Sequence, residues 1–299
     1  MGYLLDGSWT DDEHWPTDAD GRFTREAARF RIPDGDLAVE SGRYHLVLAH
    51  ACPWCHRVAI ARELKGLSDA ISVSFVDPIM REGGWRFTDA EHSDPLYDSR
   101  FAHELYTRTD PRFTGRVTVP ILWDRRQERI VCNESTDIVR IFDAAGSGPT
   151  LFPEALQEEQ QRWTDLIYER INNGVYRCGF ARSQAAYEEA FRSLFDALAT
   201  VSAHLAGRSF LVGDALTAVD LYLFVTLVRF DAVYVGHFKC NLYRIRDDAV
   251  LRQWLRRMAE MPACRQTIVM DEIKRHYYGS HHNLNPSGIV PVGPELDLE

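Results

Sequence analysis

The feature that constrains this chain most is the motif Cys52-Pro53-Trp54-Cys55, which stands between a predicted strand and a predicted helix. An apolar run, 44–49, precedes the motif, and apolar residues at roughly helical spacing follow it. The first cysteine is then at a helix N-terminus, where unpaired N–H groups and the helix dipole favour its thiolate. Proline at the first helical position loses no hydrogen bond. A Cys-x-x-Cys motif in a β-α-β pattern therefore indicates a redox or thiol-transfer site.

Three other interpretations of the motif are open. With His56 it has the spacing of a haem c attachment site, which belongs to exported proteins. A zinc site would need a second ligand pair, and neither His237 with Cys240 nor His276 with His281 has paired-cysteine spacing. The two thiols could also be buried and structural. The other four cysteines are scattered and are expected to be small buried hydrophobic residues: Cys132, Cys178, Cys240 and Cys264.

Composition excludes several classes of protein. The chain has 299 residues, of which 45% are hydrophobic and 26% are charged, and its formal net charge is −10. This is globular composition, and the acidic balance argues against a nucleic-acid or anionic-membrane partner. The chain lacks both an apolar run of about 18 residues and a signal-peptide pattern, so we expect a cytoplasmic protein.

Strand and helix patterns divide the chain into four parts. Residues 1–42, rich in Gly and Asp, are expected to form an irregular extension. Residues 43–146 follow the order β-α-β, a long polar insert, then β-β-α. Residues 155–275 are predicted to be all-helical, and the tail 276–299 is predicted to be a loop. The individual predictions are strands at 44–49, 71–76, 117–123 and 129–132, helices at 101–106, 134–142 and 187–205, and a capping-box spacing at 217–220 that precedes the apolar run 221–228.

Two further segments of the α/β region are candidates for ligand binding. In a thioredoxin-like fold, a cis-proline at Thr118-Val119-Pro120 brings the preceding backbone beside the cysteine, where it can pair with a peptide-like ligand. The alternative is a trans-proline on an edge strand. Glu134 and Ser135 begin the last helix of the region, where N–H groups and a hydroxyl can hold a carboxylate. A simple helix cap is the alternative there.

Four tyrosines lie in aromatic, glycine-containing segments: Tyr176, Tyr234, Tyr277 and Tyr278. A phenol hydroxyl can stabilise a thiolate and protonate a leaving group. For each tyrosine taken alone, packing in the core is the alternative.

Together these segments resemble the xi class of glutathione transferases, the glutathionyl-hydroquinone reductases. The motifs are long and cover most of the chain. They are Cys52-Pro53-Trp54, 84–87, 115–124, 133–135, 172–176, 227–231, 234–242, 273–281 and 285–291. The chain departs from the family at Cys55, where the pattern usually has alanine, so a Cys52–Cys55 disulfide is an additional route.

The resemblance implies an α/β thioredoxin-like N-terminal domain, an all-α C-terminal domain, a homodimer, and a C-terminal tail that contributes to the active site. It implies Cys52 as the nucleophile, Tyr176 as proton donor or acceptor, and Tyr234 and Tyr277 as groups that lower the cysteine pKa. The implied thiol-binding residues are Trp85, Arg116, Val117, Thr118, Val119, Pro120, Glu134 and Ser135.

The implied reaction is reduction of an S-conjugated hydroquinone by a small thiol. The Cys52 thiolate attacks the conjugate sulfur, Tyr176 protonates the ring carbon, and a second thiol resolves the mixed disulfide. This needs neither a metal nor a tightly bound cofactor. Only three lysines stand among 34 basic residues, which indicates a GC-rich genome. Some GC-rich bacteria use mycothiol, so the co-substrate is glutathione or mycothiol.

Two other functions compete with this hypothesis. A glutaredoxin-like dithiol oxidoreductase would use Cys52 and Cys55 on protein or mixed disulfides. A non-catalytic protein that binds aromatic ligands would retain quinone binding after loss of Cys52.

Overall fold

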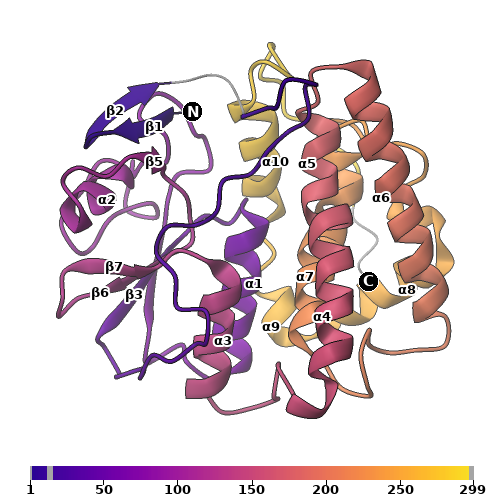
Figure 1. The fold of residues 1–299 in the computed structure, drawn as a ribbon, viewed down its shortest axis with the longest axis horizontal. Coiled ribbons are helices and arrows are strands. Elements are labelled where there is room, and N and C mark those ends of the chain that lie inside the picture. The colour runs from indigo at the N-terminus through magenta and orange to yellow at the C-terminus, as the bar shows by residue number, and fades with distance from the viewer. Residues whose placement is uncertain (1, 12–15, 296–299) are drawn as a thin grey trace. The chain divides into compact units, whose positions relative to one another are not determined.

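The computed structural model describes residues 2–11 and 16–295, and these form two compact units (Figure 1). The first unit takes its described residues from 1–14, 26–148 and 267–290. The second takes its described residues from 15–25, 149–266 and 291–299. None of the helices in residues 2–11 and 16–295 has the length and apolarity that crossing a membrane requires.

The first unit is built on a four-stranded sheet in the order β4-β3-β6-β7. Its strands are β3 (Tyr44–Leu48), β4 (Ser72–Phe75), β6 (Ile121–Asp124) and β7 (Arg129–Cys132). Strand β3 pairs parallel to β4 and antiparallel to β6, and β6 pairs antiparallel to β7. Every residue of β3 is buried, as the apolar run predicts. Helices α1 (Pro53–Leu64) and α3 (Ser135–Ala145) pack against each other (Figure 1), which completes a thioredoxin-like unit and confirms the predicted fold class.

The N-terminal segment contains a hairpin where we expected irregular structure. Strand β1 (Gly2–Leu5) pairs with β2 (Ser8–Asp11) and, on its other edge, with β5 (Gly115–Arg116). Asp6 and Gly7 form the two-residue turn, with φ of 48° and 79°. Positive φ at both positions is what such a tight hairpin requires, and Asp-Gly supplies it. The Gly and Asp that suggested irregular structure therefore specify this turn.

The strand expected over 117–123 is shorter than predicted. Residues 117–120 lie in no strand, and β6 begins at Ile121, because Pro120 has no N–H to donate to a ladder. The Val119–Pro120 peptide bond is cis, so the trans alternative is wrong. Helix α2 (His103–Thr109), in the polar insert, packs near β7. It begins two residues and ends three residues after the helix expected at 101–106.

The C-terminal tail also differs from the prediction. Helix α10 (Met270–Ser280) continues through residues 276–280, which we expected to be a loop, and it belongs to the first unit. Its packing explains this difference. A Cβ on Gly279 would lie 2.7 Å from Ile79 Cδ1, so glycine allows a close approach, and the Met80 N–H donates to Ser280 Oγ at 2.9 Å. Tertiary contacts, rather than local pattern, stabilise this last turn.

The second unit is helical, as predicted. Its helices are α4 (Gln157–Leu166), α5 (Asn173–Gly179), α6 (Gln184–Leu205), α7 (Ala218–Arg229), α8 (Ala249–Glu260) and α9 (Pro262–Arg265), with 3-10 turns at Glu154–Leu156 and Ile245–Asp247 and π-helical turns at Ile167–Asn172 (η2) and Phe230–Tyr234 (η3). Every residue of α7 is buried, so it forms the centre of this unit. The capping box predicted at its start is confirmed between Thr217 and Asp220.

Candidate active site

Cys52 is the N-cap residue of α1. Its extended backbone aims the side chain at the first turn, and Sγ accepts the Cys55 N–H at 3.4 Å. Pro53 occupies the first helical position, as the motif predicts. The side chain is half-buried. A sulfur at this position accepts from the helix N-terminus and faces the positive end of the dipole, both of which favour the thiolate.

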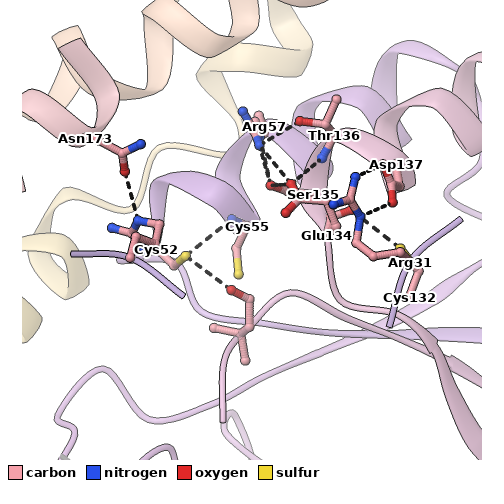
Figure 2. Close-up of polar contacts among 12 residues, drawn as sticks. Arg31, Cys52, Cys55, Arg57, Cys132, Glu134, Ser135, Thr136, Asp137 and Asn173 are labelled. Atoms are coloured by element: carbon pink, nitrogen blue, oxygen red, sulfur yellow. Dashed lines mark hydrogen bonds and ion pairs between the residues drawn. The ribbon is translucent and has the colours of Figure 1, made fainter. Parts of the chain in front are cut away.

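The carbonyl of Val119 lies beside the same sulfur, with Cys52 Sγ and Val119 O 3.6 Å apart (Figure 2). As a thiol, Cys52 can donate to this oxygen; as a thiolate it cannot, and the carbonyl is then open to a ligand N–H. The Tyr106 hydroxyl donates to Thr118 O at 2.8 Å and fixes the preceding residue. The predicted juxtaposition of the cysteine and the residue before the cis-proline is confirmed.

The other cysteines have a different environment. Cys55 is 1% exposed, and all four scattered cysteines are buried, as expected. Burial raises the pKa of Cys132 and of Cys264 to about 12, and it also raises the pKa of Cys240. These thiols stay protonated and unreactive near neutral pH. Cys52 is therefore the nucleophile candidate.

Glu134 and Ser135 open α3, as predicted, and a buried arginine joins them. Glu134 is the N-cap residue, and its Oε1 accepts the Thr136 N–H at 3.2 Å. Arg57, on α1, donates to Ser135 Oγ from Nε at 3.0 Å and from Nη2 at 2.5 Å. Arg57 Nη2 also lies 3.5 Å from Glu134 Oε1 (Figure 2). Sequence reasoning missed Arg57, although an arginine among apolar residues on the helix that carries the motif is a signal that could have found it.

Trp85 contacts the C-terminal helix. Its indole stacks on the imidazole of His276, with ring centroids 4.9 Å apart and planes 17° apart. The His276 Nδ1–H donates to Pro78 O at 2.8 Å, which fixes the ring. Tyr277 is the next residue of α10, is buried, and meets the His276 ring edge-on. The structure thus brings Trp85 together with the segment that carries Tyr277. His276, which contacts Trp85 directly, is a second residue that was not among the predicted site residues.

Tyr176 and Tyr234 come together in the second unit. Tyr176 lies on α5 and Tyr234 ends η3, with ring centroids 6.3 Å apart. Phe238 packs against both rings, at 5.4 Å and 5.5 Å. The guanidinium of Arg25 lies 5.0 Å from the Tyr176 ring centroid, and its Nε donates to Asn173 Oδ1 at 2.8 Å. The two tyrosines therefore belong to one aromatic cluster with a cation against it.

A thioredoxin-like unit with a cysteine at its first helix, combined with a helical unit, is the architecture of glutathione transferases. Family models agree with this class. The model described as the glutathione S-transferase N-terminal domain matches residues 51–145, and the model described as the C-terminal domain matches residues 184–257.

Individual relatives narrow the class. The glutathionyl-hydroquinone reductase PcpF of Sphingobium chlorophenolicum is 48% identical, over 100% of this chain and 98% of its own. The glutathione S-transferase Xi of Phanerochaete chrysosporium is 43% identical with a TM-score of 0.90, over 94% of this chain and 96% of its own. The glutathione-bound structure of YqjG from Escherichia coli K-12 is 43% identical with a TM-score of 0.89, over 99% of this chain and 97% of its own. The chain therefore belongs to the xi class of the glutathione transferase family, the glutathionyl-hydroquinone reductase family, as its motifs predicted.

Proposed function

We propose that this chain is a glutathionyl-hydroquinone reductase that uses Cys52 as its nucleophile. The observation that supports this most is the position of Cys52 Sγ at the start of α1, 3.4 Å from the Cys55 N and 3.6 Å from Val119 O. The relative PcpF carries the name of this activity, and its similarity extends over the full length of this chain.

The reaction proceeds through a mixed disulfide. The Cys52 thiolate attacks the sulfur of a glutathionyl-hydroquinone, the carbon–sulfur bond breaks, and its electron pair goes to the ring carbon. Tyr176 supplies the proton to that carbon, and free hydroquinone leaves. A second glutathione thiolate then attacks the Cys52 mixed disulfide and releases glutathione disulfide. One glutathione thiol and the thioether sulfur of the conjugate are oxidised to one disulfide, and the ring carbon is reduced by two electrons.

The first unit offers complementary groups for glutathione. Glu134 suits the ammonium of the γ-glutamyl group, and Ser135 with the N-terminus of α3 suits its carboxylate. The Val119 carbonyl suits the cysteinyl N–H, and the Trp85 side chain with the backbone of 116–118 and Pro120 completes the proposed site. Tyr234 and Tyr277 are proposed to lower the Cys52 pKa. Mycothiol lacks the γ-glutamyl group, so these residues favour glutathione, and mycothiol is tested beside it.

Mass spectrometry of a single turnover tests the proposal. The reduced protein is mixed with a glutathionyl- or a mycothiolyl-hydroquinone in the absence of free thiol. A Cys52 adduct that carries the thiol, with hydroquinone released, is the expected result and identifies the thiol. A Cys52–Cys55 disulfide with hydroquinone released would retain the reaction and make Cys55 the resolving group. Conjugate that binds but stays intact would overturn the reductase and favour a binding protein. Sedimentation of the same sample tests the homodimer that we also propose.

A further inference from the structure

We propose that Arg57 is a positioning residue that fixes the Ser135 hydroxyl as a hydrogen-bond donor, and that it thereby selects thiols that carry an α-carboxylate. This inference rests on the proposed function, because it concerns the thiol that the same site takes. Three observations support it: the hydrogen bonds of Ser135, the burial of the charges, and the link between two helices.

The hydrogen bonds of Ser135 leave it one role. Its Oγ accepts two N–H groups of Arg57, Nε at 3.0 Å and Nη2 at 2.5 Å. A hydroxyl oxygen has two lone pairs, and these two bonds occupy both. What remains is the O–H, which points at Glu134 Oε1, 3.5 Å away. That contact is long, so the proton can turn to a better acceptor when a ligand arrives. Any ligand group that meets Ser135 Oγ must therefore be an acceptor, such as a carboxylate, and cannot be an ammonium.

Burial strengthens this selection. The Arg57 side chain is 2% exposed, and guanidinium stays charged even inside a protein. Glu134 is 19% exposed, with its Oε1 3.5 Å from Arg57 Nη2. In a poorly solvated site, a positive charge behind Ser135 and a negative charge at Glu134 act strongly on a ligand. The pair complements a group that carries both an ammonium and a carboxylate, which is an α-amino-acid unit.

Arg57 also joins two helices. It projects from α1, whose N-cap is Cys52, and its Nη2 donates to Thr136 Oγ1 on α3 at 3.0 Å (Figure 2). The Trp54 ring lies 5.7 Å from the guanidinium carbon. The planar fork of arginine reaches Ser135 and Thr136 together, which the single ammonium of lysine cannot reproduce with the same geometry. The side chain of Arg57 thus links the helix that begins at Cys52 to Ser135 and Thr136 at the start of α3.

The test compares two conjugates of one hydroquinone, one made with glutathione and one with 2-mercaptoethanol, which lacks both carboxylate and ammonium. The variants are R57Q, R57K and S135A, with R62Q as a matched control. Arg62 lies on the same helix and donates to Ile71 O and Ser68 O, away from Ser135. Calorimetric binding of glutathione and thermal unfolding are measured on every variant.

For R57Q we expect the KM of the glutathionyl conjugate and the Kd of glutathione to rise about tenfold, the factor that loss of one charged hydrogen bond produces. We expect kcat to stay within about twofold, and the mercaptoethanol conjugate to be turned over as in wild type. R57K should fall between R57Q and wild type. The double variant R57Q/S135A should bind glutathione about as weakly as either single variant, because both remove the same donor. R62Q should bind glutathione as wild type does.

Three results would overturn the inference: an unchanged Kd in R57Q, equal losses for both conjugates, or additive effects in the double variant. If R57Q does not fold, R57K and S135A carry the same test, and wild-type affinity in both would overturn it. A wild-type protein that binds glutathione but turns over neither conjugate would instead refute the proposed function, while the binding measurements would still decide the role of Arg57.

Discussion

The imidazole of His276 stacks on the indole of Trp85 and donates from Nδ1 to the carbonyl of Pro78, 2.8 Å away. One side chain of the C-terminal helix thus fixes both the ring of a proposed thiol-binding residue and the loop before it. Tyr277, which is proposed to lower the Cys52 pKa, follows His276 on the same helix. Its position therefore depends on the same contacts of His276.

Substitution of His276 separates the stack from the hydrogen bond. H276A loses both contacts, and we expect it to raise the KM of the glutathionyl conjugate about tenfold. H276F keeps a ring against Trp85, so its KM should stay within about threefold of wild type. Both should unfold at lower temperature, because Pro78 O loses its donor at a cost of about 1–3 kcal/mol. Steady-state kinetics and thermal unfolding measure the two effects.

His92 provides a matched control. It also attaches to α10, through Nε2 to Glu272 Oε1 at 3.2 Å, and its Nδ1 contacts Asp89 Oδ1 at 3.0 Å. H92A should lower thermal stability and leave the KM unchanged. Equal KM changes in H92A and H276A would show that the attachment of the helix, and not the stack, controls the site.

The two cysteines of the motif should differ sharply. C52A should abolish hydroquinone release, since no other described thiol lies at a helix N-terminus with a half-buried sulfur. C55A should keep activity within about threefold, because Cys55 contacts Cys52 Sγ through its backbone N–H, which alanine retains. Release of hydroquinone, followed by chromatography, measures both. If C55A were as inactive as C52A, the dithiol route would replace the second-thiol route.

Sequence reasoning succeeded where local pattern carries the information. The Cys-Pro-Trp-Cys motif predicted its own helix cap, and alternating or fully apolar runs predicted β3, β4 and β7. Sequence reasoning failed where contacts between distant segments of the chain determine the local structure. Helix α10 reaches Ser280 because Gly279 packs on Ile79, about 200 positions away in the chain, and no local rule encodes that contact. Arg57 stands among apolar residues of its helix, but its partner Ser135 is identified only when α3 is placed beside α1.

Gly179 controls the packing of the tyrosine cluster. A Cβ at Gly179 would lie 2.2 Å from Phe238 Cδ1, and Phe238 packs on both Tyr176 and Tyr234. G179A should therefore destabilise the protein by about 1–3 kcal/mol through overpacking and lower kcat by displacing Tyr176, the proposed proton donor. Chemical denaturation and kinetics measure the two effects.

Gly174 is the control on the same helix. Its added Cβ would meet Leu194 Cδ1 at 3.5 Å, which is ordinary contact. G174A should keep kcat and raise stability by up to about 1 kcal/mol, because alanine favours the helix. A loss of kcat in G174A as large as that in G179A would contradict a specific role for the Phe238 contact.

Acid should destabilise the first unit through His45. This buried side chain of β3 contacts Ser72 Oγ at 2.8 Å and Ser74 Oγ at 2.9 Å, and burial lowers its pKa from 6.5 to about 4. Between these two pH values the unfolded chain binds a proton that the folded chain does not, so stability falls as pH falls. The loss reaches about 3 kcal/mol near pH 4 and is absent above about pH 7.

In H45Q this contribution vanishes, so its free energy of unfolding should depend less on pH than that of wild type. Urea denaturation of H45Q and wild type at a series of pH values measures both curves, and parallel curves would refute the assignment.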